Sequence, residues 1–179
     1  SLGGLNYLQE KEEIKIVPFK HNRTISLISK DYITSILQST KDLYFFGTMG
    51  SGIIEYNMTT NEAHLYNKKN GLPNNVVYGI LQDDRVNIWL STNYGISVFG
   101  LKTNTFFNFT NEAELQASEF NRFAYASFNQ ELFFGGVNGL TYFIPEEFRP
   151  ANKTYPVYIE TIETNKQKFN VLDSKSDTK

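Results

Sequence analysis

Two adjacent carboxylates, Asp83 and Asp84, are the residues of this sequence best suited by type and spacing to chemistry, because paired carboxylates can share acid–base work. Trp89, the chain's only tryptophan, follows within a few residues and could form an aromatic platform for a ligand. Imidazole could come only from His21 and His64, which are far apart in the sequence. Cysteine is absent, which excludes disulfides and thiolate metal sites. We therefore expect no metal site and no cofactor.

The composition is that of a folded domain that does not bind nucleic acid. The 179 residues suffice for one domain or slightly more, and 40% hydrophobic and 15% aromatic residues supply a core. The net charge of -2 and the pI of about 5.7 leave no basic excess to neutralise phosphates. No apolar run approaches the roughly 20 residues of a membrane helix, so we expect membrane attachment only through regions outside this sequence.

The elements that must position these residues repeat along the chain with a period of about 44 residues. Shifted by one period, Ile36-Leu37-Gln38 falls on Ile80-Leu81-Gln82, and the segment 88–92 falls on 132–136. A fainter copy opens the chain at residues 4–7. A period in the low forties with strand-like segments is typical of propeller blades, so we predict an all-β partial β-propeller of four-stranded antiparallel blades.

The second repeat shows the strands most clearly. We predict strands over residues 76–82, 87–92, 96–99 and 105–109, with turns at Asp83–Val86, at Asn93–Gly95 and at Thr103-Asn104. No helix is expected before residue 145, and one helical turn is expected at residues 145–148, where Pro145 suits a first helical position.

The repeat changes how the first candidates are interpreted. Trp89 aligns with Phe45 and Phe133, which favours a packing role in the slot between blades over a ligand platform. The pair Asp83-Asp84 aligns with Ser39-Thr40 and Ser127-Phe128, so it does not recur. Asp in a strand turn commonly bonds its own backbone, and this interpretation is favoured over acid–base chemistry. We therefore predict no catalytic residue and no enzyme activity for this chain.

The residue pattern of the repeat resembles the regulator-propeller repeats of hybrid two-component sensors. The family pattern of Gly-Leu-Pro-x-Asn-x-Val, an apolar run ending in Asp, Asn-Leu-Trp-Ile-Gly-Thr and x-x-Gly-Leu corresponds here to residues 71–76, 80–83, 87–92 and 95–96. Ser91 replaces a Gly of the pattern, and Arg85-Val86 stands where the family usually has a Gly turn. The resemblance covers almost all of residues 3–165.

Further resemblances imply the domain organisation. Residues 115–122 and 134–140 resemble the last blade before the family's small β-sandwich, the Y_Y_Y domain, and residues 155–165 resemble the first strand of that sandwich. The resemblance implies that residues 1–149 are C-terminal blades of a regulator-type propeller. It implies that residues 150–179 hold the start of the sandwich and a polar tail.

The same resemblance implies a function in signal transduction. A complete member looks like a periplasmic sensor of an inner-membrane protein in a two-component system for polysaccharide utilisation. It would dimerise, bind an oligosaccharide and relay the signal to a histidine kinase. The kinase and DNA-binding parts of such a protein are absent from this sequence, so no nucleic acid contact is expected. The alternatives are a protein-interaction propeller scaffold and, less favoured, a propeller glycosidase or lyase.

Candidate ligand contacts lie in turns, where propellers bind ligands. Asn93 and Tyr94 occupy one turn, Asn138 occupies the equivalent turn of the next repeat, and Asn121 and Arg122 precede the last inner strand. Tyr94 is the most suggestive, although a turn aromatic can also pack on its own blade. Arg122 could pair with an acidic sugar or with Glu119.

Too few repeats are present to close a ring by themselves. Each blade of a propeller buries its faces on its neighbours, so an isolated set of blades exposes apolar faces. We therefore expect this chain to self-associate through exposed blade faces.

Overall fold

The computed structural model describes residues 6–10, 14–18, 31–110, 115–147, 161–163 and 168–170, and side chains for residues 31–110, 115–147 and 161. The chain divides into two compact units, Ser1–Arg149 and Pro150–Lys179. The second unit contains one antiparallel pair of short strands, β14 (Thr161–Glu163) and β15 (Lys168–Asn170). The residues of the predicted sandwich strand that precede Thr161 lie outside the described residues.

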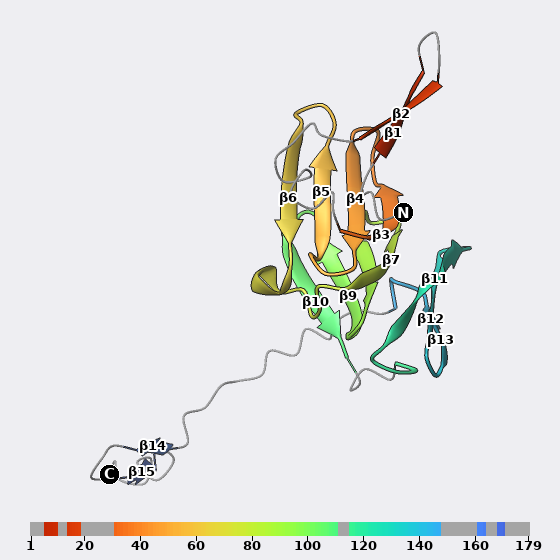
Figure 1. Ribbon diagram of the computed structural model, residues 1–179. Coiled ribbons are helices and arrows are strands. Elements are labelled where there is room, and N and C mark those ends of the chain that lie inside the picture. The colour runs from red at the N-terminus through yellow and green to blue at the C-terminus, as the bar shows by residue number, and fades with distance from the viewer. Residues whose placement is uncertain are drawn as a thin grey trace. The chain divides into compact units, whose positions relative to one another are not determined.

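The first unit is built from antiparallel sheets of consecutive strands (Figure 1). Two of these sheets have four strands, one has three, and a further two-stranded hairpin pairs β1 (Asn6–Glu10) with β2 (Ile14–Pro18). The first blade contains β3 (Ile33–Gln38), β4 (Leu43–Thr48), β5 (Ile53–Asn57) and β6 (Glu62–Tyr66). The second blade contains β7 (Val77–Gln82), β8 (Ile88–Thr92), β9 (Gly95–Gly100) and β10 (Thr105–Phe109). The third blade contains β11 (Phe120–Phe128), β12 (Glu131–Gly136) and β13 (Gly139–Phe143).

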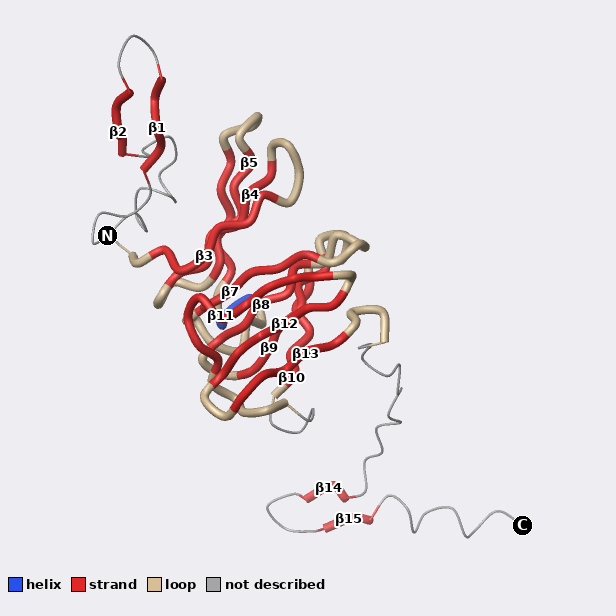
Figure 2. The backbone as a smooth tube through the Cα atoms, turned by 90° about the vertical axis from the view of Figure 1, so that its right-hand side faces the viewer, coloured by secondary structure: helices blue, strands red, loops and turns tan. Residues whose placement is uncertain are grey.

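The innermost strands of the three blades meet one another. β7 contacts both β3 and β11, and β3 also contacts β11. Figure 2 shows these three strands lying close together. This arrangement is that of propeller blades, and it confirms the all-β fold predicted from the repeat.

Two apolar cores fill the spaces between successive blades. The core between the first and second blades includes Phe45, Ile80 and Phe99, and the core between the second and third blades includes Trp89, Phe120 and Phe134. Trp89 is 2% exposed, and its ring lies 4.9 Å from the ring of Phe143 in the third blade. The packing role predicted for Trp89 is therefore confirmed.

The segment that joins the first blade to the second is held by its own polar groups. A short 3-10 helix, η1 (Lys68–Asn70), was not expected from the sequence, and Asn67 caps it through a capping box with Asn70. Gly71 ends it at φ 104°, a conformation that favours glycine. Leu72 then buries its side chain in the core between the blades. The Gly-Leu-Pro motif of the sequence is thus a structural connection.

One detail of the sequence interpretation needs correction. Ser127 and Phe128 are not a turn, because β11 extends to Phe128 and the turn follows at Asn129-Gln130, where both residues have positive φ. The reason is that the third inner strand carries extra residues that shift the alignment. Residues 145–147 form a hydrogen-bonded turn in which Glu147 N donates to Ile144 O at 3.0 Å, and Phe148 lies outside the described residues.

Candidate functional site

Antiparallel pairing brings all of the predicted ligand residues to one end of the blades. The backbone N–H that follows the second strand of each blade donates to the carbonyl that precedes or begins the innermost strand. These bonds join Met49 to Tyr32 at 3.1 Å, Asn93 to Val76 at 3.2 Å and Val137 to Glu119 at 3.2 Å. We call the side chains that meet here, Tyr32, Tyr78, Asn93, Glu119 and Arg122, the axis-end cluster.

Arg122 links the third blade to the first in this cluster. Its guanidinium carbon lies 5.7 Å from the ring centroid of Tyr32, a cation–π distance. Within the described residues no ion pair joins Arg122 to Glu119, so the pairing with Glu119 considered from the sequence is not formed. An exposed guanidinium on an aromatic face is held in place while its N–H groups remain available for a ligand.

Tyr78 links the second blade to the same cluster. Its hydroxyl donates to Asn93 Oδ1 at 3.0 Å, so the amide oxygen of Asn93 is already used within the protein. Burial and the charge of Glu119 raise the pKa of Tyr78, and the charge of Arg122 opposes them. Tyr78 therefore stays protonated and keeps donating to Asn93 across the neutral range.

The other three predicted residues are exposed at the same end. Tyr94 is 50% exposed, and its backbone N–H donates to Thr92 Oγ1 at 2.9 Å. Asn138 donates its backbone N–H to Gln116 Oε1 at 2.8 Å, and the Asn121 side chain is open to solvent. The structure therefore joins Asn93 and Arg122 in one cluster and leaves Tyr94, Asn121 and Asn138 around it.

A bulge in β11 extends this end of the third blade. Phe120 pairs with Gly136 and Tyr125 with Phe134, so residues 121–124 stand where the second blade has only Tyr78 and Gly79. Phe123 in this bulge has φ 62° and is 70% exposed, an unusual state for a bulky residue. Bulges commonly re-aim side chains beside functional sites. No signal in the sequence marked the bulge, because the shift between the second and third repeats stays at 44 residues.

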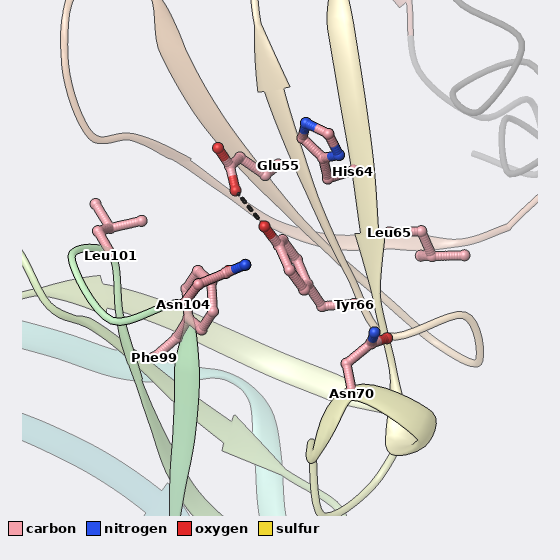
Figure 3. A pocket seen from close by; sticks show the side chains of 8 residues that line it. All are labelled: Glu55, His64, Leu65, Tyr66, Asn70, Phe99, Leu101 and Asn104. Carbon is pink, nitrogen blue, oxygen red and sulfur yellow. Dashed lines mark hydrogen bonds between the residues drawn. The ribbon is translucent and has the colours of Figure 1, made fainter.

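A second site, which sequence reasoning missed, lies between the outer strands of the first and second blades (Figure 3). This inter-blade pocket has a volume of about 510 Å³. Its lining residues come from β5, β6 and η1 on one side and from β9 and the turn after it on the other, and they are Glu55, His64, Leu65, Tyr66, Asn70, Phe99, Leu101 and Asn104. The two sides are far apart in the sequence, so no local motif marked the pocket.

One hydrogen bond organises the inter-blade pocket. The Tyr66 hydroxyl donates to Glu55 Oε2 at 2.9 Å, and Figure 3 shows the amide of Asn104 pointing toward this pair. Burial raises the pKa of Tyr66 well above its usual range, and the hydrogen bond and charge of Glu55 add to the effect. The ring of Tyr66 also contacts Phe99, with centroids 4.8 Å apart. The pocket therefore presents one carboxylate, one phenol and carboxamides over an aromatic floor.

Comparisons with known proteins agree with this fold. Residues 71–94 match the family model described as the two-component regulator propeller. Histidine kinase P4 of Formosa agariphila is 30% identical over 154 residues, which are 83% of this chain and 11% of that protein.

Solved structures give the same picture. The extracellular domain of a hybrid two-component system from B. thetaiotaomicron matches with a TM-score of 0.60 and 28% identity, covering 64% of this chain and 16% of that one. The extracellular domain of a one-component system from the same organism matches with a TM-score of 0.56 and 18% identity, covering 65% of this chain and 16% of that one. At this lower identity the second match supports the fold alone.

The four-stranded sheets and the match to the family model define the class of protein. The chain is a segment of a β-propeller built from two-component regulator repeats. The resemblance recognised in the sequence is thereby confirmed, and the chain is part of the extracellular sensing region of a hybrid two-component system. It spans only 11% to 16% of the length of these relatives. In the described part of the chain, no helix has the length and apolar character needed to cross a membrane.

Proposed function

We propose that this chain contributes to a periplasmic ligand-sensing region that binds an oligosaccharide and relays the signal to a histidine kinase. The observation that carries the proposal is the axis-end cluster, in which Tyr32, Tyr78 and Arg122 bring together side chains from all three blades. Sugars bind to aromatic rings flanked by amides and charged groups, and this end of the blades has that character. The relay to a kinase rests on the similarity to histidine kinase P4.

The bulge in β11 adds support for this end as the binding surface. Phe123, exposed beside Arg122, gives an apolar face that a sugar ring can cover. Tyr94 provides a second exposed ring at the equivalent end of the second blade. A ligand lying across the axis-end cluster would touch more than one blade, so binding would alter how the blades pack together.

A thermal-shift experiment tests the proposal. The complete extracellular region that contains this chain is screened against neutral and acidic oligosaccharides. A ligand at a hundred times its dissociation constant adds about 2.7 kcal/mol to the free energy of unfolding. We expect at least one oligosaccharide to raise the melting temperature. We expect Arg122→Ala to reduce the affinity for that oligosaccharide at least tenfold.

Arg122→Lys serves as the matched control because it keeps the charge and removes the planar guanidinium. A weak effect of Arg122→Lys would indicate that charge alone matters, and an effect equal to that of Arg122→Ala would indicate bidentate or stacking contacts. Unchanged melting temperatures with every saccharide would contradict the proposal. In that case, capture of a protein without any glycan dependence would favour the scaffold alternative, and release of new reducing ends would favour a glycosidase.

We also propose that the isolated chain pairs with a second copy through the third blade. Phe128, Phe133, Leu140 and Tyr142, here called the third-blade face, lie on one side of the sheet, and all except the half-buried Phe133 are largely exposed. The equivalent faces of the first and second blades are covered by the following blade. An apolar face of this kind favours association, and a second copy of the chain offers a matching apolar face.

A further inference from the structure

The inter-blade pocket differs from the equivalent place between the second and third blades. The register of the outer strands aligns Glu55 with Val98, His64 with Phe107 and Tyr66 with Phe109. In the second blade these positions are apolar: Val98 packs against the core, and the rings of Phe107 and Phe109 lie 4.8 Å apart. In the first blade the same positions carry a carboxylate, an imidazole and a phenol.

The fold does not require these polar residues. The second blade folds the same pair of outer strands with an apolar set, and Phe109 there stacks on Trp89 with centroids 6.0 Å apart. Placing a carboxylate and a phenol between blades costs desolvation energy, which is only partly offset by their mutual hydrogen bond. The interface between the first and second blades carries polar residues where the equivalent interface carries apolar ones. This difference indicates that the first interface serves a ligand.

The lining residues define the chemical class of that ligand. The Glu55 carboxylate accepts hydrogen bonds from hydroxyl groups and repels anions, while the amides of Asn70 and Asn104 can donate or accept. Phe99 and Tyr66 present ring surfaces, which suit the apolar C–H faces of a sugar. The volume of about 510 Å³ lies within the usual range for small-molecule sites.

Asn104 provides a further polar contact at the edge of the pocket. Its backbone has φ 54°, a left-handed conformation that asparagine tolerates, and the turn it forms is closed by a bond from its N–H to Gly100 O at 2.8 Å. The side chain is exposed and points into the pocket (Figure 3). Because Asn104 belongs to the second blade and Glu55 to the first, one ligand would hold both blades.

We propose that the inter-blade pocket is a second saccharide site, distinct from the axis-end cluster, that takes a neutral polyhydroxylated sugar unit between Glu55, Tyr66 and Asn104. The proposal rests on the proposed function in taking the ligand to be a saccharide. It adds the position of the site and the exclusion of acidic sugars. Occupation of the pocket would fix the first and second blades against each other.

Calorimetric titration of the complete extracellular region tests this proposal. The probes are maltotriose, cellotriose and mannotriose as neutral sugars, and trigalacturonate as an acidic one. The main variant replaces the polar set with that of the second blade, Glu55→Val with His64→Phe and Tyr66→Phe. We expect a neutral probe to bind, the triple variant to weaken its binding at least tenfold, and the melting temperature of the free variant not to fall.

Two single variants keep the test valid if the triple variant does not fold. Glu55→Gln removes the charge, and Asn104→Gly removes the amide while keeping a residue suited to positive φ. Each variant should reduce the affinity for the neutral probe at least threefold. Glu62→Gln is the matched control, because Glu62 is an exposed carboxylate on the same strand as His64 but outside the pocket. It should leave the affinity unchanged.

The outcomes separate the two proposals. A neutral probe whose binding is insensitive to Glu55→Gln, Asn104→Gly and the triple variant, but lost in Arg122→Ala, overturns the second site and leaves the proposed function standing. Tighter binding of trigalacturonate in Glu55→Gln than in the wild type supports the exclusion of acidic sugars by Glu55. Absence of binding by any saccharide to the wild-type region overturns both proposals.

Discussion

Trp89 Nε1 donates a hydrogen bond of 2.9 Å to Asp83 Oδ2, joining the chain's only tryptophan to the turn that precedes its strand. Asp83 also accepts from the backbone N–H groups of Arg85 and Asn87 and from Asn87 Nδ2. All of these bonds serve the turn and the blade interface. The carboxylate that first suggested acid–base chemistry is therefore committed to structure, as the turn interpretation predicted.

Asp83→Ala should destabilise the chain by about 1–3 kcal/mol, because it removes the acceptor of four hydrogen bonds, including the one from the Trp89 N–H. Asp84→Ala is the control, because Asp84 is exposed beside it, and it should change the free energy of unfolding by less than about 0.5 kcal/mol. Urea unfolding followed by tryptophan fluorescence measures both. Equal effects of the two substitutions would contradict the assigned role of Asp83.

Gly52→Ala should destabilise the chain by at least about 1–3 kcal/mol from backbone strain alone. Gly52 has φ 101°, and a Cβ there would collide with the carbonyl oxygen of Tyr66. Its N–H also donates to Asn75 O at 2.9 Å, which ties the first blade to the segment that enters the second. The result is read from thermal unfolding.

Gly50→Ala, in the same turn, is the matched control for Gly52→Ala. A Cβ at Gly50 meets no atom within 4 Å, and Gly50 does not have positive φ. This substitution should be neutral or stabilise by up to about 1 kcal/mol. A loss of stability as large as that in Gly52→Ala would show that the geometry of the turn, and not the position of Gly52, is at fault.

Tyr66→Phe should make the stability of the chain fall less steeply as the pH rises into the alkaline range. The pKa of Tyr66 is raised in the folded chain above the ordinary 10.0, so the unfolded chain releases this proton first as the pH rises. The contribution is fully present below about pH 10 and is lost as the pH rises toward the folded value. Melting temperatures between about pH 9 and 11 should therefore fall less steeply in Tyr66→Phe than in the wild type.

Glu55→Gln provides an internal check on that linkage. Glu55 contributes to the raised pKa of Tyr66 through its hydrogen bond and charge, after burial. Between about pH 9 and 11, the melting temperature of this variant should therefore fall with a slope between those of the wild type and Tyr66→Phe. A slope identical to that of the wild type in both variants would mean that folding does not raise the pKa of Tyr66.

Leu140→Ser combined with Tyr142→Ser should weaken self-association of the isolated chain at least tenfold. Burying one large apolar side chain contributes about 1.5–3 kcal/mol, and tenfold in affinity corresponds to about 1.4 kcal/mol. Tyr142 is 62% exposed and stacks on Phe133 with centroids 5.9 Å apart, so the face is exposed and ordered. Light scattering over a range of concentrations measures the effect.

Met58→Ser is the control for the third-blade face, because Met58 is an exposed apolar residue in a turn of the first blade. It should leave the association unchanged. A wild-type chain that remains monomeric at every concentration would contradict the proposal, whatever the variants do.

The repeat made the blades predictable because strand structure depends on local features. The strand expected at residues 105–109 matches β10 (Thr105–Phe109), and the one expected at 76–82 matches β7 (Val77–Gln82) within one residue. The packing of Trp89 also followed from its alignment with Phe45 and Phe133 in the repeat. The bulge in β11 was obscured because a fixed period cannot register extra residues within one copy.

The sequence by itself determined the class of fold, the blade order and the turn role of Asp83, because these depend on neighbours along the chain and on a regular period. Only the tertiary structure decided that Arg122 lies over Tyr32 and that Glu55, Tyr66 and Asn104 share one pocket. Those groups meet because successive sheets pack face to face around an axis. Contacts made by stacking join residues at long separations, and no local spacing encodes them.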